Sequence, residues 1–127
     1  MTQSLNVRKF AAYAAIAAIL NLLIFFIAKG ADATMIVNQG GSQEIAVPMV
    51  FASTFFGLLM AAFVASKIGK KSQSFLSKSP TIGLVFGIVT AAAPFSASDD
   101  SKTALALASM HVVAGVTWYL GAKRSIK

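Results

Sequence analysis

The sequence predicts an all-α integral membrane protein, with four transmembrane helices in an up-down bundle that forms a single domain over residues 1–127. Three observations support this prediction. The chain is 57% hydrophobic and only 12% charged, whereas soluble domains usually carry about 25% charged residues. Four uncharged runs are each close to the roughly 20 residues that cross the hydrocarbon of a bilayer. Most basic residues lie on alternate connections between these runs, as in cytoplasmic loops of membrane proteins.

The first helix is expected over residues 7–29, because the stretch from Phe10 to Ala28 carries no charge. A basic start at Arg8 and Lys9, followed by the small residues around 31–33, also resembles a signal peptide. The uncharged stretch of 19 residues exceeds the usual signal-peptide core of about 7–15 residues. We therefore interpret this run as a retained helix.

Three further helices are expected over residues 47–67, 80–96 and 101–122. Ser79 and Pro80 suit the cap and the first turn of the third helix. Pro94 is expected to end or kink this helix, since the residue before a proline avoids helical backbone angles. The resulting span is short, so a re-entrant segment is the alternative. Only four full crossings bring every strongly basic segment to one side of the membrane.

Charge predicts an orientation with the amino and carboxyl termini in the cytoplasm. Nine of the eleven Lys and Arg residues fall on the proposed inner side, and all four Asp and Glu residues fall outside. Nucleic-acid binding is disfavoured, because the positive charge follows the membrane pattern.

Aromatic residues at the inner helix ends are expected to anchor the interface: Phe10, Tyr13, Trp118 and Tyr119. Four lysines between the second and third helices are expected to meet lipid headgroups: Lys67, Lys70, Lys71 and Lys78.

The first outer connection predicts a short β-hairpin over about residues 33–47, in which two β-prone runs flank the turn formers of residues 38–42. An isolated hairpin is marginal in water, so we expect it to rest on the helix ends or on a neighbouring protein. Three roles of the hairpin are compatible with the sequence: a lid, a docking surface and a plain connection. The last outer turn, residues 98–101, suits a helix cap, with a weak cation site as the less favoured alternative.

Each predicted helix carries small residues at spacings of three or four, which allow membrane helices to approach closely. These stripes predict a tight bundle. The residues expected to form the helix contacts are Gly57, Ala61, Gly83, Gly87, Ala108 and Gly115.

A polar residue lies on the small face of every helix, about seven to ten residues, or roughly 10–15 Å, from the outer helix end. These residues could form a buried polar layer: Asn21, Ser53, Thr90 and His111. His111 is the only histidine, and ionisable groups inside a membrane are functional candidates by default. We favour a neutral His111 that pins the helices by hydrogen bonds. A ligand or ion site, or axial ligation of a haem or chlorin, are the alternatives. No metal site is expected within one chain, which has no cysteine and no second histidine.

The segment Met110-His111-Val112-Val113-Ala114-Gly115 resembles the last helix of a bacterial family of small four-helix membrane proteins, known as domain of unknown function 6069. The resemblance extends along most of the chain, including the region of Asn21, the pair Gly40-Gly41, and Ala93-Pro94 with the acidic turn that follows. It implies a four-helix membrane fold and bacterial origin. With the predicted orientation, we expect the protein in the bacterial inner (cytoplasmic) membrane. The resemblance implies no activity.

No catalytic constellation is recognisable, because a hydrolase needs a nucleophile, a base and an orienting group in reach of one another. Ser109 and His111 are two residues apart and face different sides of a helix. We therefore expect no enzyme, no catalytic residue and no resident cofactor. The preferred hypothesis is a structural or accessory subunit that forms a homo-oligomer or joins a larger membrane complex. The alternatives are a small oligomeric transporter or channel that uses the layer around His111, and a membrane-embedded carrier of a ligand, haem or pigment.

Overall fold

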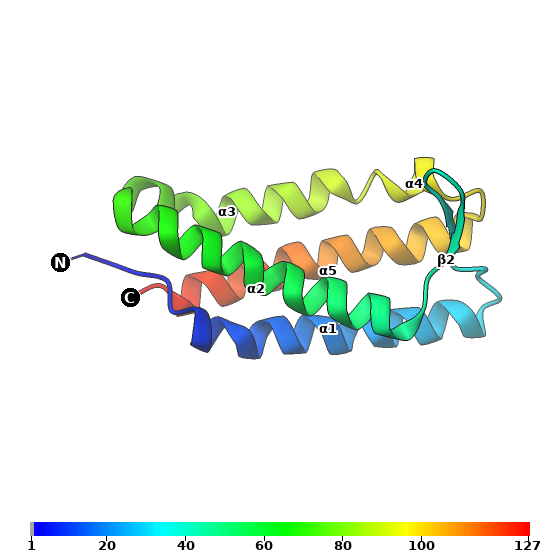
Figure 1. The fold of residues 1–127 in the computed structure, drawn as a ribbon, viewed down its shortest axis with the longest axis horizontal. Helices are drawn as coiled ribbons and strands as arrows, with labels where there is room; N and C mark the ends of the chain where they lie inside the picture. Colours follow the sequence, from blue (N-terminus) through cyan, green and yellow to red (C-terminus); the bar gives the residue numbers. More distant parts are fainter. Residues whose placement is uncertain (1) are drawn as a thin grey trace.

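The computed structural model describes residues 2–127 and consists of four long helices with a small two-stranded hairpin at one end (Figure 1). Successive long helices run in opposite directions, and both chain ends lie at the same end of the bundle. We call this end the termini end and the opposite one the hairpin end. The elements in chain order are α1 (Val7–Gly30), β1 (Ile36–Asn38), β2 (Ser42–Glu44), α2 (Val47–Lys71), α3 (Gln73–Thr90), α4 (Pro94–Ala97) and α5 (Ser101–Ser125).

In the described part of the chain, four helical segments are long and apolar enough to cross a membrane. They are α1, α2, α5, and α3 taken together with α4 over residues 73–97. Their most apolar windows have mean hydropathies of 2.4, 2.1, 1.4 and 1.5 in that order. This confirms the predicted all-helical fold with four candidate spans and one hairpin.

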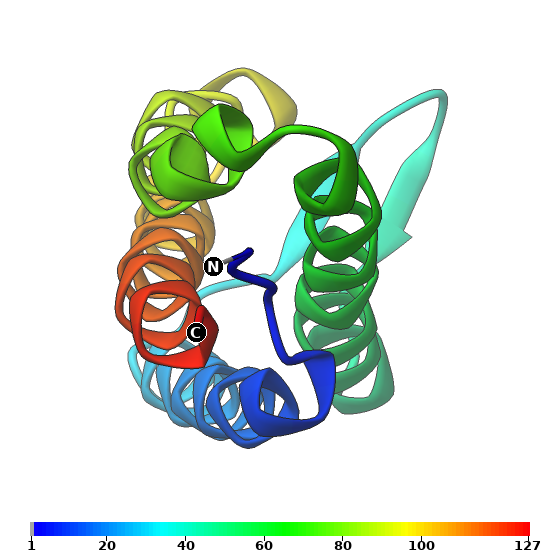
Figure 2. The same ribbon diagram turned by 90° about the vertical axis from the view of Figure 1, so that its left-hand side faces the viewer.

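The helices form a ring in the order α2, α1, α5, α3 (Figure 2). The helix α1 packs along both α2 and α5, and α3 packs along α5. The contact between α2 and α3 is much smaller, because these helices are joined at the termini end and separate from there on (Figure 1). The ring is therefore closed on three sides and open between α2 and α3.

The connection between α2 and α3 is tighter than the sequence predicts. Residues 67–78 were expected as a loop, yet only Ser72 is not helical between the two helices. The Ser72 hydroxyl accepts a hydrogen bond from the Phe75 amide at 3.2 Å and so caps α3. The predicted start of the third helix near residue 80 is therefore wrong by about two turns, since lysines are well tolerated at exposed helix ends.

Pro80, expected at the helix start, lies inside α3. A proline has no amide hydrogen, so it leaves the carbonyl four residues earlier without its helical partner. Here that carbonyl belongs to Leu76, and it accepts a hydrogen bond from the Ser79 hydroxyl at 2.8 Å. At the other end, α3 stops at Thr90, and Pro94 starts the short α4. This agrees with the predicted break near Ala93.

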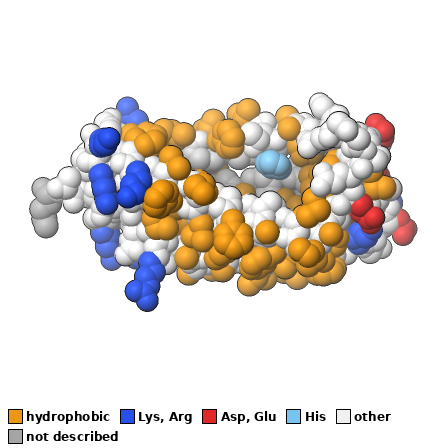
Figure 3. Space-filling view, in the orientation of Figure 1, with side chains coloured by type: hydrophobic (Ala, Val, Ile, Leu, Met, Phe, Trp, Pro, Cys, Tyr) orange, Lys and Arg blue, Asp and Glu red, His pale blue; other side chains and the backbone are white. Residues whose placement is uncertain are grey.

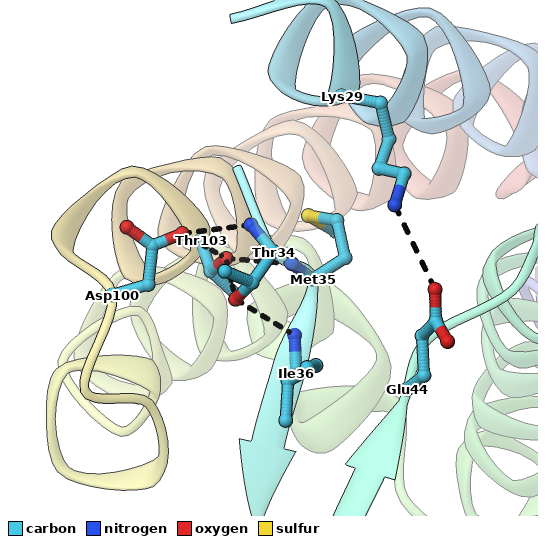
Figure 4. Close-up of polar contacts among 7 residues, drawn as sticks. All are labelled: Lys29, Thr34, Met35, Ile36, Glu44, Asp100 and Thr103. Atoms are coloured by element: carbon cyan, nitrogen blue, oxygen red, sulfur yellow. Dashed lines mark hydrogen bonds and ion pairs between the residues drawn. The ribbon is translucent and has the colours of Figure 1, made fainter. Parts of the chain in front are cut away.

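The hairpin is fixed to the start of α5 (Figure 4). The Thr34 amide and the Thr103 hydroxyl donate to the Asp100 carboxylate at 2.9 and 2.7 Å. The Met35 amide donates to the Thr103 hydroxyl at 2.8 Å, and Met35 is fully buried. An ion pair joins Lys29 on α1 to Glu44 on β2 at 3.7 Å. The hairpin thus rests on the helix ends, as expected, and Asp100 also caps α5.

Acid is expected to loosen the hairpin. The hydrogen bonds from the Thr34 amide and the Thr103 hydroxyl lower the pKa of Asp100 from its ordinary 3.8 to about 2. Because the folded-state pKa is depressed, the stabilising effect is fully present above the ordinary value and is lost as the pH falls through about 2. Amide exchange at Thr34 and Met35, corrected for its intrinsic pH dependence, should show less protection at pH 2 than at pH 5.

Asp100→Asn is the matched control for this experiment, because its side chain does not titrate. Its protection should be lower at pH 5 and should change little between the two pH values. Equal protection of the unaltered chain at both pH values would contradict the assignment of Asp100 as the anchor.

A candidate ligand-binding groove

A groove opens on the side of the bundle between α2 and α3 (Figure 3). Its volume is about 630 Å³, within the roughly 300–1,000 Å³ typical of small-molecule sites. The space-filling view shows the hollow with the single histidine visible inside it. Lys, Arg, Asp and Glu are absent from its walls in the part of the chain that the structure describes. The groove is therefore an uncharged, almost wholly apolar site.

Small residues line both the α2 wall and the α3 wall of this groove. Gly57 and Ala61 are exposed on the α2 wall, and a methyl group added at Gly57 would meet no atom within 4 Å. Across the groove, the wall includes Gly83 and Gly87 of α3. A side chain at Gly83 or Gly87 would point at α5, so the hollow comes from the divergence of α2 and α3 and from the small residues on α2. Residues of α5 close it from behind.

A second cavity of about 260 Å³ continues toward the hairpin end. It shares His111 and Ala114 with the groove, and its walls add Asn21, Ser53 and Thr54. This cavity is more polar than the groove. His111 thus lies where an apolar compartment meets a smaller compartment with hydrogen-bonding groups.

His111 is held through one ring nitrogen. Its Nδ1 lies 3.2 Å from the Thr90 hydroxyl oxygen. That hydroxyl has one hydrogen, which it donates to the Phe86 carbonyl at 2.7 Å. The Thr90 oxygen must therefore accept from Nδ1–H, which assigns the neutral tautomer from its hydrogen-bond partners. In this tautomer Nε2 carries a lone pair, and it has no partner within residues 2–127.

The expected polar layer is brought together only in part. Thr90 and His111 are in contact, whereas Asn21 donates to Thr54 at 3.0 Å and to the Met110 carbonyl at 3.4 Å. Asn21 is only 2% exposed, and its Oδ1 has no partner among the described residues. Ser53 donates to the Met49 carbonyl of its own helix at 2.6 Å. Thr54, the partner of Asn21, was not among the predicted residues of the layer. Ser53 and Thr54 are adjacent in one apolar run, and the sequence does not show which of the two faces the bundle interior.

The residues expected at helix contacts fall into two groups. A methyl group at Gly87 would lie 2.7 Å from the Gly115 Cα, so α3 and α5 touch there backbone to backbone. Gly83 makes room for the Trp118 ring, and Ala108 is buried in the bundle. Gly57 and Ala61 differ from the expectation, because both are exposed along the groove, and a methyl group at Gly57 would meet no atom within 4 Å.

Trp118 lies in the core and also lines the groove, which differs from the expected place at an interface. It is 5% exposed, its indole Nε1 donates to the Ser79 carbonyl at 2.8 Å, and Phe10 meets it edge-on at 5.0 Å. Phe10 is fully buried too. The missing side chain at Gly83 is the reason, because it opens a slot for the indole.

The lysines expected at lipid headgroups are all exposed near the termini end, where most of the basic side chains gather (Figure 3). Lys67 also lies over the Phe63 ring, with Nζ 5.2 Å from its centre. Over residues 2–127, no group of three or more His, Asp or Glu side chains is arranged to hold a metal ion.

The sequence profile of a family of unknown function (DUF6069) matches residues 2–127. The chain belongs to this family. The family resemblance predicted from the sequence is thereby confirmed, and DUF6069 carries no assigned activity. No curated protein and no solved structure matches the chain. For this DUF6069 protein, the groove with the imidazole of His111 is therefore the candidate functional site.

Proposed function

We propose that this DUF6069 protein spans the membrane and binds a hydrophobic small molecule, taken up sideways from the bilayer, in the groove between α2 and α3. The observation that carries this proposal is the groove itself. It is uncharged, opens on the apolar flank of the bundle and contains one imidazole with a free nitrogen. Small-molecule sites combine such apolar walls with a few polar groups that fix orientation.

The distribution of charge supports four crossings with both chain ends in the cytoplasm. The membrane of this proposal is the inner membrane of a bacterium. Most basic side chains gather at the termini end, and the acidic ones lie at the hairpin end (Figure 3). Lysine and arginine are favoured on cytoplasmic loops. In this orientation the groove opens toward the lipid chains, and a ligand can enter without passing through water.

Trp118 provides a direct test, because it is the only tryptophan and lines the groove. A brominated apolar chain quenches indole fluorescence on close approach, so 12-bromo-1-dodecanol added to the protein in nanodiscs should quench it saturably. Gly57→Leu should abolish the saturable component, since its side chain would occupy the open space of the groove. Ala52→Leu is the matched control, because Ala52 is exposed on the same helix outside the groove.

Quenching that rises linearly with the probe and is the same in all three proteins would reflect dissolution in the bilayer alone. That result would overturn the proposal.

An accessory subunit is the second candidate. Gly57 and Ala61 form a small-residue pair at a spacing of four with open space before it, and such pairs favour close helix contacts. A transmembrane helix of another chain would then occupy the groove. Native mass spectrometry of gently extracted protein distinguishes the two candidates, because a bound small molecule and a second subunit differ in mass. The channel hypothesis requires a water-accessible path to His111, and the apolar lining of the groove does not favour it.

A further inference from the structure

We infer that the groove selects a neutral lipid with a hydroxyl head, such as a long-chain or isoprenoid alcohol, whose hydroxyl donates a hydrogen bond to Nε2 of His111. This inference rests on the proposed function, because it names the chemistry of the molecule that the groove would bind. It follows from three features of the site: the tautomer of His111, the absence of charge on the walls, and the polarity of the adjoining cavity.

The tautomer sets the direction of the hydrogen bond. The Thr90 hydroxyl donates to the Phe86 carbonyl at 2.7 Å, so its oxygen accepts the Nδ1 hydrogen of His111. Nε2 of the neutral ring is then an acceptor. A ligand with only acceptor groups, such as a ketone, an ester or an ether, would place a lone pair against a lone pair. A hydroxyl supplies the hydrogen that Nε2 lacks.

The uncharged walls require a neutral ligand. A fatty-acid carboxylate, a phospholipid headgroup or the two carboxylates of haem would be buried without a cationic partner, because within residues 2–127 no lysine or arginine lines either cavity. Burying an unpaired charge is very costly. The same feature argues against the axial haem site considered from the sequence, although Nε2 is free to bind a metal.

The adjoining cavity places the head and the tail. On its side of His111 lie the hydroxyls of Ser53 and Thr54 and the carboxamide of Asn21. Asn21 Oδ1 is buried and has no donor among residues 2–127, which is unusual because buried polar groups are nearly always paired. On the other side, the groove runs past Ala114 and Gly115 to Trp118 with apolar walls. The hydroxyl head therefore points to the second cavity, and the apolar tail lies along the groove.

Three probes with the same brominated dodecyl chain test the inference on the unaltered protein: 12-bromo-1-dodecanol, its methyl ether, and 1-bromododecane. The ether keeps the oxygen but cannot donate. Trp118 quenching should give a dissociation constant roughly five- to tenfold lower for the alcohol than for the alkane, as expected for one hydrogen bond. The ether should resemble the alkane.

Variants test whether His111 is the residue that recognises the hydroxyl group. In His111→Leu the alcohol should lose its advantage while the alkane still binds. In Thr90→Val the advantage should shrink, because the ring is free to adopt the other tautomer. Ser109→Ala is the control, since Ser109 bonds to the Leu105 carbonyl of the same helix and lies outside the groove. Its three dissociation constants should match those of the unaltered protein.

The outcomes separate the two proposals. Saturable binding of all three probes with equal affinity would overturn the hydroxyl preference and leave the groove as a general apolar site. An ether that binds as tightly as the alcohol would show His111 to be the donor and would overturn it as well. No saturable binding of any probe would instead contradict the proposed function.

Discussion

Gly87→Ala is expected to destabilise the bundle by about 1–3 kcal/mol, the usual cost of inserting an extra methyl group into a close-packed interior. The new methyl carbon would lie 2.7 Å from the Gly115 Cα and 3.0 Å from the His111 carbonyl oxygen. Both neighbours are backbone atoms of α5, so α3 must move away as a whole. Unfolding in mixed micelles, followed by circular dichroism, measures the change in free energy.

Gly57→Ala is the matched control, because the same methyl group enters open space. Its free energy of unfolding should equal that of the unaltered chain or rise slightly, since alanine favours helix more than glycine does. If the two substitutions cost the same, the contact between α3 and α5 would not be the close crossing described here.

Trp118→Ala is expected to cost about 3 kcal/mol, near the lower end of the range for removing a buried aromatic side chain. The indole fills the slot beside Gly83 and packs edge-on against Phe10. Its loss would leave an empty space beside the groove. The surrounding helices cannot fill this space without shifting relative to one another. The same unfolding assay applies, and circular dichroism does not depend on the missing fluorophore.

Trp118→Phe separates the hydrogen bond from the volume. Phenylalanine keeps most of the ring but cannot donate to the Ser79 carbonyl, and hydrogen bonds within membranes contribute only about 0.6 kcal/mol on average. We therefore expect a loss of about 1 kcal/mol or less. A Phe variant as unstable as the Ala variant would show that the indole N–H, and not ring volume, dominates at this position.

The helices could be predicted from the sequence because a bilayer imposes a simple requirement on each span. About 20 apolar residues are needed for a crossing, and a charged residue interrupts that pattern clearly. The start of α3 was missed because charge does not mark the end of a helix outside the hydrocarbon. Lys70 and Lys71 end α2 and Lys78 lies within α3, although all three belong to the stretch expected as a loop.

The groove could not be predicted from the sequence, because small residues permit close contact without specifying a partner. Gly87 and Gly57 appear alike along the chain, each in an apolar run with a small residue four positions away. One meets the backbone of α5 and the other meets nothing. The difference depends on how far α2 and α3 separate beyond Ser72, which is a property of the whole ring. The partner of His111 was expected among Asn21, Ser53 and Thr90, and the structure shows Thr90.

The bundle consists of two closely packed helix pairs, α1 with α2 and α3 with α5. The contact between α1 and α5 joins the two pairs, and the groove separates α2 from α3. Between α2 and α3 the chain is continuous only through Ser72, and few contacts join these two helices. The width of the groove therefore depends mainly on the angle between the two helix pairs, whereas the stability of each pair depends on its own internal packing.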